Sequence, residues 1–368
     1  TSTSNTFSGT VHLDLTGEVA LHSSGDLALL GKAELVNATA AGELAVSQLD
    51  AQDISLNAAN VVLNNLVAPG NLTLNGGSVS QQGALTVEGD TTLGASRVEL
   101  VDSSNDFKGK VIFNDAGQVA LHDMNDIRIQ GQAEALQVEA TTILEQTGAV
   151  GINGFSRFEG ATINLNNTFN RFGSMVDLQA TQEATIHSAH DLQLRSTAAT
   201  LNVNTTGNLV LGDTQVGTLN AISGGLIGQN SASAITVEER ATLSGQNVRI
   251  DGSNNDFKGV VHLTVEESTE IRDRNDLNLQ GGTQNLIADA SNGILIAGGN
   301  ESLEVSNGTL TASTIELDRL LVLNDVSLQA NSITQRQASN TGGKITLKAD
   351  TVSLTQADND FAGELVLD

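Results

Sequence analysis

The sequence predicts an all-β protein: a right-handed parallel β-helix, or β-solenoid, with coils of roughly 20 residues. Three observations predict this fold. A short phrase recurs along the chain, the distances between its copies differ by close to multiples of about 20 residues, and apolar residues alternate with polar ones in short runs. These repeats are a better guide than chain length, because a solenoid gains or loses whole coils.

The recurring phrase is clearest as Asn-Asp-Phe-Lys-Gly, which occupies Asn105–Gly109 and returns unchanged at Asn255–Gly259. Weaker copies begin at Asn5, Asn170 and Asn359. The repeat positions that we expect to be structural are Asn5, Phe7, Gly9, Asn105, Phe107, Gly109, Asn170, Phe172, Asn255, Phe257, Gly259, Asn359, Phe361 and Gly363. We therefore predict a single continuous β-helix over residues 1–368, with repeats that start near residues 5, 105, 170, 255 and 359, the last of them truncated.

Two further phrases keep a regular relation to this motif. In four copies a second phrase begins at a fixed distance after the asparagine, as in Val119–His122 after Asn105, and closes on an aspartate such as Asp126. Another stretch leads into the motif, as in Ser78–Gln81, with counterparts that end at Gln146 and Gln335. The intervals between successive motif asparagines are unequal, and they differ by close to multiples of about 20 residues. Such differences indicate that whole coils are inserted or removed between copies.

The composition favours a narrow aliphatic core. Hydrophobic residues make up 39% of the chain, but there are only nine Phe and no Trp, Tyr or Cys. Broad globular cores usually recruit aromatic side chains, whereas layers of Leu, Val, Ile and Ala suit a coil. Runs such as Leu72–Leu74 and Leu192–Leu194 predict strands of three to five residues with one buried face. A row of β-sandwiches fits less well, because the repeat is too small and no Trp or Cys pair marks such a core.

The residues of the motif fit a corner of the coil. We expect the Phe ring to pack there, the Gly to take a strained turn, and the Asn or Asp to bond to the backbone of the turn. The alternative is an exposed ladder of Asp and Asn that binds calcium. The structural interpretation is favoured, because the alternating acidic pattern of an EF-hand and the Gly-Gly-x-Gly-x-Asp pattern are both absent.

The sequence predicts no catalytic residue, no cofactor and no metal ligand. The adjacent pairs Glu238-Glu239 and Glu266-Glu267 are poor acid–base pairs, because neighbours on a strand point to opposite faces. The enzyme alternative is a β-helical lyase or hydrolase of polysaccharides, which is disfavoured by the few basic residues and the missing Trp and Tyr platforms. The histidines are expected to be structural: His12, His22, His122, His187, His190 and His262.

Charge and hydropathy argue against two kinds of partner. The chain has 17 Lys plus Arg against 43 Asp plus Glu, a net charge of -26, so binding of nucleic acid through its phosphates is not expected. No apolar run reaches the length of a membrane span, so membrane insertion is not expected either. Thr1 and Asp368 both fall within a repeat, and no signal-peptide pattern opens the chain, which predicts a piece of a longer protein.

The motif Asn-Asp-Phe-x-Gly-x-Val, followed by Val-x-Leu and Asp-Leu-x-Leu phrases, resembles the repeats of filamentous-haemagglutinin-like exoproteins. These are the large secreted partners of bacterial two-partner secretion, and they include host-cell and biofilm-matrix adhesins. The resemblance covers nearly the whole chain. It implies an exported β-helix, secreted or displayed on the bacterial cell surface, whose partner is an outer-membrane transporter that acts through a region outside this chain.

From this resemblance we expect the structural shaft of a secreted adhesin, extending from the cell surface and supporting attachment or biofilm-matrix cohesion, without enzymatic activity. The alternative is that the shaft itself binds exopolysaccharide or host glycans through ladders of Asn, Thr, Ser and Gln. Segments that interrupt the repeat are where such a site is expected: Val67–Asn71, Gly217–Ser233 and Ser339–Gly343.

Overall fold

The computed structural model describes residues 5–368, and every regular element among them is a β-strand. Neighbouring strands run parallel wherever a register is defined. The predicted all-β, parallel β-solenoid is therefore confirmed. The chain groups into two compact units, Thr1–Thr181 and Gln182–Asp368.

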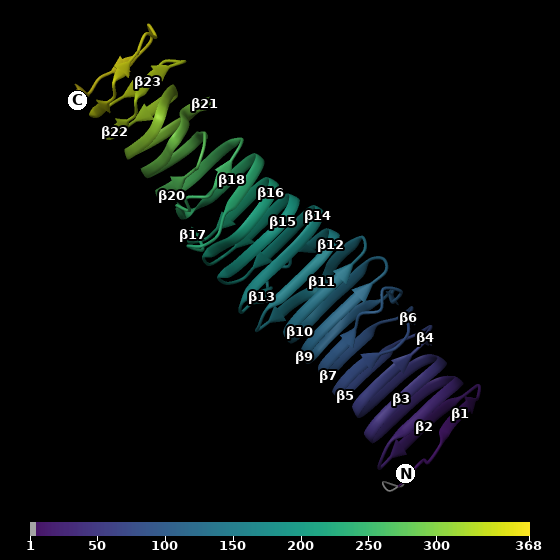
Figure 1. Cartoon of the computed structure of the whole chain (residues 1–368). Coiled ribbons are helices and arrows are strands. Elements are labelled where there is room, and N and C mark those ends of the chain that lie inside the picture. Colours follow the sequence, from purple (N-terminus) through teal and green to yellow (C-terminus); the bar gives the residue numbers. More distant parts are fainter. Residues whose placement is uncertain (1–4) are drawn as a thin grey trace. The chain divides into compact units, whose positions relative to one another are not determined.

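In chain order, the strands of the first unit are β1 (Thr10–Asp14), β2 (Glu18–Ser23), β3 (Leu27–Asn64), β4 (Leu66–Ala68), β5 (Leu72–Gln81), β6 (Leu85–Val87), β7 (Thr91–Leu100), β8 (Asp106–Phe107), β9 (Lys110–Asp123), β10 (Ile127–Ala140), β11 (Ile143–Ile152), β12 (Ser156–Leu165), β13 (Arg171–Phe172) and β14 (Met175–Ser188), the last of which continues into the second unit. Its coils follow one another in the purple, blue and teal part of the ribbon (Figure 1).

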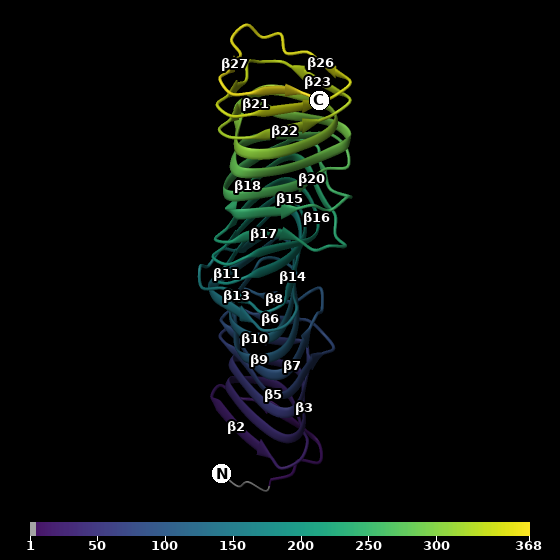
Figure 2. The same ribbon diagram turned by 90° about the vertical axis from the view of Figure 1, so that its left-hand side faces the viewer.

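The strands of the second unit are β15 (Leu192–Thr205), β16 (Leu209–Ser223), β17 (Leu226–Gln229), β18 (Ile235–Ile250), β19 (Asp256–Phe257), β20 (Val260–Arg272), β21 (Leu277–Val322), β22 (Val326–Gln329), β23 (Ser332–Gln335), β24 (Asn340–Thr341), β25 (Ile345–Lys348), β26 (Thr351–Val352), β27 (Asp360–Phe361) and β28 (Leu365–Leu367). Here β18, β20 and β21 belong to successive coils, and their ribbons lie one above another (Figure 2).

The coil length follows from the register between strands. Thr10 pairs with Ala28 of the next coil. Leu72 pairs with Thr91, and Thr91 in turn pairs with Val111. Each of these pairings advances the chain by about one repeat unit of roughly 20 residues, as the sequence predicted.

Several strands are longer than the three to five residues that the sequence pattern predicted. β3 has 38 residues and β21 has 46. β3 pairs with β1 near its start and with β5 near its end, so it continues round more than one corner. The alternation of apolar and polar residues starts anew after each corner. The backbone at the corner still hydrogen-bonds to the adjacent coil, so the pairing of the strands is not interrupted.

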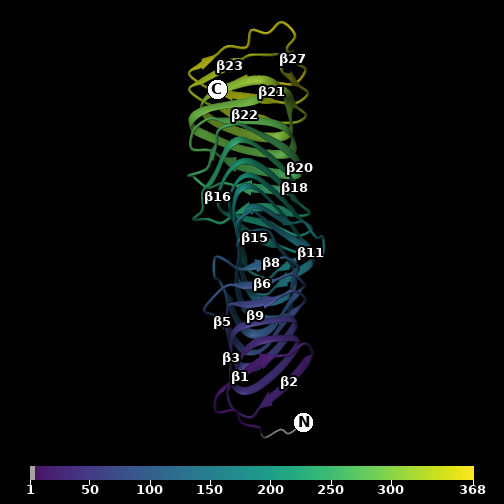
Figure 3. The ribbon, with the colours of Figure 1, turned by 90° about the vertical axis from the view of Figure 1, so that its right-hand side faces the viewer.

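The core consists of columns of inward-facing apolar side chains. Leu56 pairs with Leu74 and Leu74 with Leu93, and Leu93 pairs with Phe113. All four side chains are at most 2% exposed. Burial of one such side chain contributes about 1.5–3 kcal/mol, so every coil adds its own share of stability to the unit. The stacking of β3, β5 and β9 can be followed in Figure 3.

Three of the glycines with positive φ angles lie at one repeated position after the second phrase, and none lies in the motif itself. Gly31, Gly131 and Gly281 hold the same position relative to a motif asparagine and have φ angles of 113°, 108° and 87°. A Cβ atom on Gly131 would lie 2.1 Å from the carbonyl oxygen of Phe113. Both the conformation and the lack of space require glycine there, so the repeated unit extends further along the chain than the sequence pattern indicated.

Candidate functional site: the stacked motif turns

The motif asparagine is bonded to a glutamine from the preceding coil. Nδ2 of Asn105 donates to Oε1 of Gln81 at 2.9 Å, and Nε2 of Gln81 donates to Oδ1 of Asn105 at 2.8 Å. The same Oδ1 accepts the N–H of Leu85 at 3.0 Å, and Nδ2 also donates to the carbonyl of Leu100 at 3.1 Å. Asn105 is completely buried, and these four bonds offset the cost of removing its amide from water.

This reciprocal contact, called here the amide tie, occurs in four copies of the motif. The pairs are Gln81–Asn105, Gln146–Asn170, Gln229–Asn255 and Gln335–Asn359. Each glutamine ends the stretch that leads into the motif in the sequence. Two phrases that the sequence shows as separate repeats are therefore two halves of one contact between coils.

The glycine that ends the motif differs from the expectation. Gly109 and Gly259 do not have the positive φ of a strained turn. A Cβ on Gly109 would lie 2.0 Å from the carbonyl oxygen of Gly89, and a Cβ on Gly259 would lie 1.5 Å from that of Glu239. Gly9, at the same motif position in the first described coil, has nothing within 4 Å. Glycine is needed here because stacked turns approach each other closely.

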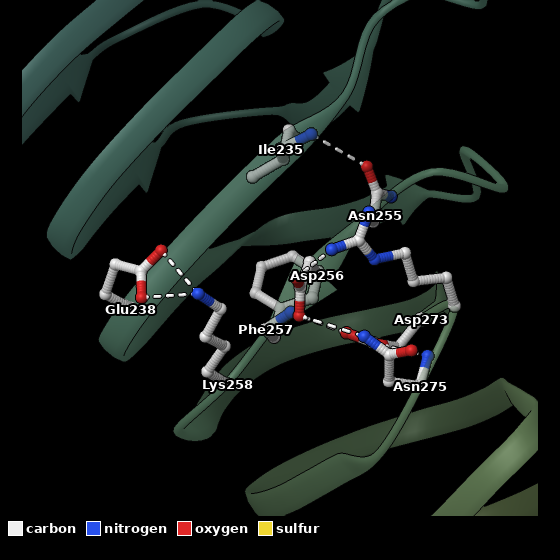
Figure 4. Close-up of polar contacts among 9 residues, drawn as sticks. Ile235, Glu238, Asn255, Asp256, Phe257, Lys258, Asp273 and Asn275 are labelled. Atoms are coloured by element: carbon white, nitrogen blue, oxygen red, sulfur yellow. Dashed lines mark hydrogen bonds and ion pairs between the residues drawn. The ribbon is translucent and has the colours of Figure 1, made fainter.

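A buried carboxylate from the following coil holds the backbone of two motif copies. Oδ2 of Asp273 accepts the N–H of Phe257 at 2.5 Å, and its Oδ1 accepts the N–H of Asn275 at 2.6 Å (Figure 4). Asp123 makes the matching pair of bonds in the first unit, each 2.7 Å long. Both aspartates are at most 2% exposed, and charge-assisted bonds to two backbone N–H groups compensate for their burial.

Burial raises the pKa of both carboxyl groups. At Asp123 burial is the largest influence on the pKa, and at Asp273 burial raises the pKa to about 6. The hydrogen bonds from the backbone N–H groups lower the pKa in both cases. At Asp273 the neighbouring Asp256 raises the pKa further, and the guanidinium of Arg274 lowers it.

The residue at the position of this carboxylate differs between copies of the motif. Asp123 and Asp273 hold the same position after the asparagine in the two copies that read Asn-Asp-Phe-Lys-Gly. The first and third copies have Ser23 and Ser188 at that position. Each serine Oγ accepts the N–H two residues further on, at 3.3 Å. Serine thus keeps the local turn bond of the carboxylate.

Exposed ion pairs join the same two copies to the preceding coil. Nζ of Lys258 lies 2.6 Å from Oε2 of Glu238 (Figure 4), and Nζ of Lys108 lies 2.5 Å from Oε1 of Glu88. All four side chains are almost half exposed. Solvent-exposed pairs contribute little to stability, so the buried amide and carboxylate contacts outweigh them in holding the turn.

Two of the histidines contact acidic side chains of other coils. Nε2 of His122 is 3.4 Å from Oε1 of Glu139, and Nδ1 of His262 is 3.1 Å from Oε2 of Glu301. Within residues 5–368, no group of three or more His, Cys, Asp or Glu side chains is close enough together to hold a metal ion. The same described residues contain no helix of the length and hydrophobicity that crossing a membrane requires.

The segments expected to interrupt the repeat are mainly regular coil. Gly217–Ser223 continues β16 in register with β15, and residues 340–341 form β24. The turn at Pro69 is stacked on the preceding coil, because the N–H of Gly70 donates to the carbonyl of Gln52 at 2.6 Å. The second segment also contains an exposed turn at residues 230–232. The expectation of a glycan site in these three segments stays a prediction.

A groove of about 630 Å³ lies over residues 262–304 of the second unit. Gly281 and Gly282 lie among its lining residues, and the acidic side chains of Glu266, Glu301 and Glu304 surround them. Sequence reasoning missed this groove, because it arises from glycines that lie between longer side chains of adjacent coils.

The strand register and the amide ties define a class of protein, a β-solenoid built from repeats that share one stacked turn. A family model described as repeats of unknown function (DUF5649) matches residues 51–114, 116–179, 181–264 and 305–368. The matches cover well over half of the chain, which therefore belongs to this family. No curated protein and no solved structure gives a significant match. The resemblance to filamentous-haemagglutinin-like exoproteins stays a prediction.

The family repeats end at a fixed place relative to the motif. Each matched stretch ends shortly after a motif asparagine and always at the same distance from it, at residues 114, 179, 264 and 368. The third stretch is longer than the others by the length of one coil. Each repeat therefore contains one complete amide tie. Residues 265–304, which contribute most of the acidic groove, lie outside the matched stretches.

Proposed function

We propose that this chain is a structural shaft segment of an exported bacterial adhesin that supports attachment or biofilm-matrix cohesion. The observation that carries the proposal is the amide tie, which every matched family repeat contains. Contacts that recur from repeat to repeat make stability a sum over neighbouring units. Such a chain can be lengthened without a new core, which is the property a shaft needs.

The proposal includes a location at the cell surface or in the secreted fraction, with an outer-membrane transporter as the partner in export. The lack of cysteine supports it, since the chain has no disulfide to form before or after crossing an envelope. The net charge of -26 supports it as well, because like-charged surfaces resist side-by-side aggregation of exposed solenoids.

A purely structural role without catalysis is part of the proposal. Glycoside hydrolysis needs two carboxyl groups that face each other across the scissile bond. The adjacent glutamates contact different partners: Glu238 bonds to Lys258, whereas Oε2 of Glu239 accepts the hydroxyl of Thr218 at 3.2 Å. Their carboxylates are thus occupied in separate contacts between coils.

The test uses two deletions in the cells that produce the protein. Deletion of residues 116–180 removes one whole family repeat together with its one-residue spacer, so that the following stretch stays in register. We expect it to preserve export and the specificity of attachment while reducing its extent. Deletion of residues 116–169 removes Gln146 but leaves Asn170 without its partner, and we expect it to make the protein sensitive to protease.

Antibody labelling of intact cells and attachment assays measure both outcomes. The shaft role is wrong if the protein stays inside the cell. It is also wrong if loss of one whole repeat abolishes attachment as completely as loss of the gene, although export is unchanged.

A further inference from the structure

The outward face of the first unit contains a small hollow over β7, β9 and β10. Its volume is about 200 Å³, and the side chains of Arg97, Glu99, Gln118, Gln137 and Phe155 line it. Phe155 is 44% exposed. The motif phenylalanines Phe107, Phe172 and Phe257 are buried. The ring of Phe155, by contrast, remains accessible beside hydrogen-bonding groups that line the same hollow.

Two alanines create the hollow. Side chains of successive coils stand next to one another on this face, so that Ala135 lies beside Gln118. Ala120 lies between Glu99 and Gln137 in the neighbouring column. The short alanines interrupt columns of longer side chains. Because paired strands fix all of these positions, the hollow is already formed in the free protein.

The corresponding positions of the second unit carry longer side chains. Glu270 takes the place of Ala120, and Asn285 takes the place of Ala135, at the same distances from the motif asparagine. Oε2 of Glu270 lies 3.3 Å from Nε of Arg249, and Oδ1 of Asn285 accepts a bond from a later coil at 3.2 Å. The solenoid therefore tolerates filled columns at these positions.

We infer that the hollow binds one ring of a neutral saccharide within a longer glycan. A pyranose ring has an apolar face of C–H groups and a rim of hydroxyls. The ring of Phe155 suits the apolar face, and the amide of Gln137 can donate and accept hydrogen bonds. The amide of Gln118 can donate, while its Oε1 accepts a hydrogen bond from Nη1 of Arg97 at 3.3 Å. Arg97 and Glu99 lie 3.4 Å apart and balance each other's charge, which favours a neutral ligand.

The size of the hollow supports one ring. Its volume of about 200 Å³ lies between a cavity of ~150 Å³ that holds benzene and the ~300–1,000 Å³ of pockets for larger ligands. A single bound ring of this kind gives a weak site, with a Kd on the order of 1 mM. This activity is separate from the proposed shaft role, because it depends on outward side chains and not on the amide ties.

The experiment titrates the 368-residue chain with neutral tetrasaccharides of glucose, mannose and galactose, and with an oligogalacturonate as the anionic probe. Chemical-shift changes in NMR spectra report binding. We expect at least one neutral probe to bind with a Kd on the order of 1 mM, and the anionic probe to bind more weakly. Phe155→Ala should weaken binding about tenfold.

Filling the hollow should remove binding. Ala135→Asn introduces the residue that the second unit has at this position, and Ala120→Gln provides an independent filled variant. Phe169→Ala is the matched control, since Phe169 is 75% exposed and does not line the hollow. The inference is overturned if no neutral probe binds, if the anionic probe binds best, or if Phe155→Ala and Ala135→Asn leave binding at the level of Phe169→Ala.

Discussion

Asn105–Gly109 and Asn255–Gly259 have the same sequence and the same inward contacts, but their outward neighbours differ. Both asparagines are held by an amide tie, and both phenylalanine N–H groups bond to a buried aspartate. The next residue after that aspartate is Met124 in one copy and Arg274 in the other, where the guanidinium contacts Asp256. The comparison teaches that contacts between coils determine the turn, whereas the outward positions are free to acquire different roles.

Loss of the amide tie should have the largest effect. Asn255→Ala removes both bonds to the amide of Gln229, which keeps its contacts with Ser233 and Gly252. It also leaves the buried N–H of Ile235 without its partner and removes the bond to the carbonyl of Ile250. A buried unpaired polar group costs about 1–3 kcal/mol, so we expect the free energy of unfolding to fall by about 3 kcal/mol. Urea denaturation followed by circular dichroism measures this change, and Asn105→Ala should cost a similar amount.

The control for the tie is Asn37→Ala, because Asn37 is exposed on a strand. Its substitution should change the free energy of unfolding by less than about 0.5 kcal/mol. Equal costs for Asn37→Ala and Asn255→Ala would show that the tie contributes nothing.

The motif glycine should give the next largest effect. The added Cβ of Gly259→Ala meets the carbonyl oxygen of Glu239, and the stacked turns must separate. We expect a loss of about 2 kcal/mol in the free energy of unfolding. Gly9→Ala changes the same motif position where space is open, and should be nearly neutral. A neutral Gly259→Ala would contradict the close-approach explanation.

The buried aspartates should make stability depend on pH. The pKa of Asp273 rises from 3.8 to about 6 on folding. The folded state therefore binds the proton more tightly, and this contribution is fully present below pH 3.8 and is lost as the pH rises through about 6. Urea midpoints between pH 4 and 7 should fall in the wild type, and Asp273→Ser should flatten that slope.

Arg274→Met makes the second copy resemble the first. The guanidinium of Arg274 lowers the pKa of Asp273, so its removal should move the titration of Asp273 to higher pH. Carbon NMR of the carboxyl group reports the midpoint directly. A midpoint that stays in place would mean that Arg274 acts only on Asp256.

The exposed ion pairs should have the smallest effect. Lys258→Gln removes the contact with Glu238, but both groups remain in water, where such pairs contribute little. We expect a smaller loss than for any substitution above, and no difference from wild type in ~1 M salt, where the Debye length is about 3 Å. A loss that persists at high salt would indicate a packing role for the lysine stem.

The repeats and the period-2 alternation were sufficient to predict the β-solenoid and its coil length. They were not sufficient to predict that Gln81 bonds to Asn105, because the two are 24 residues apart and their meeting depends on where the corners fall within a coil. The need for glycine at position 109 could not be predicted for the same reason, because it depends on the carbonyl oxygen of Gly89 in the preceding coil. The hollow beside Phe155 had no sequence signal at all, because its alanines resemble any other small outward residues.

The amide tie also bears on the order in which the coils of the solenoid fold. If the chain is exported through a pore, as proposed above, and emerges with its N-terminus first, Gln81 can bond to Asn105 only after a further 24 residues have emerged. Each closed tie would then hold together coils that have already folded, and the glutamine of the next tie, Gln146, follows 41 residues after Asn105. Under the proposed export, a row of such ties would act as a ratchet, because each coil that folds outside the pore would prevent the chain from slipping back.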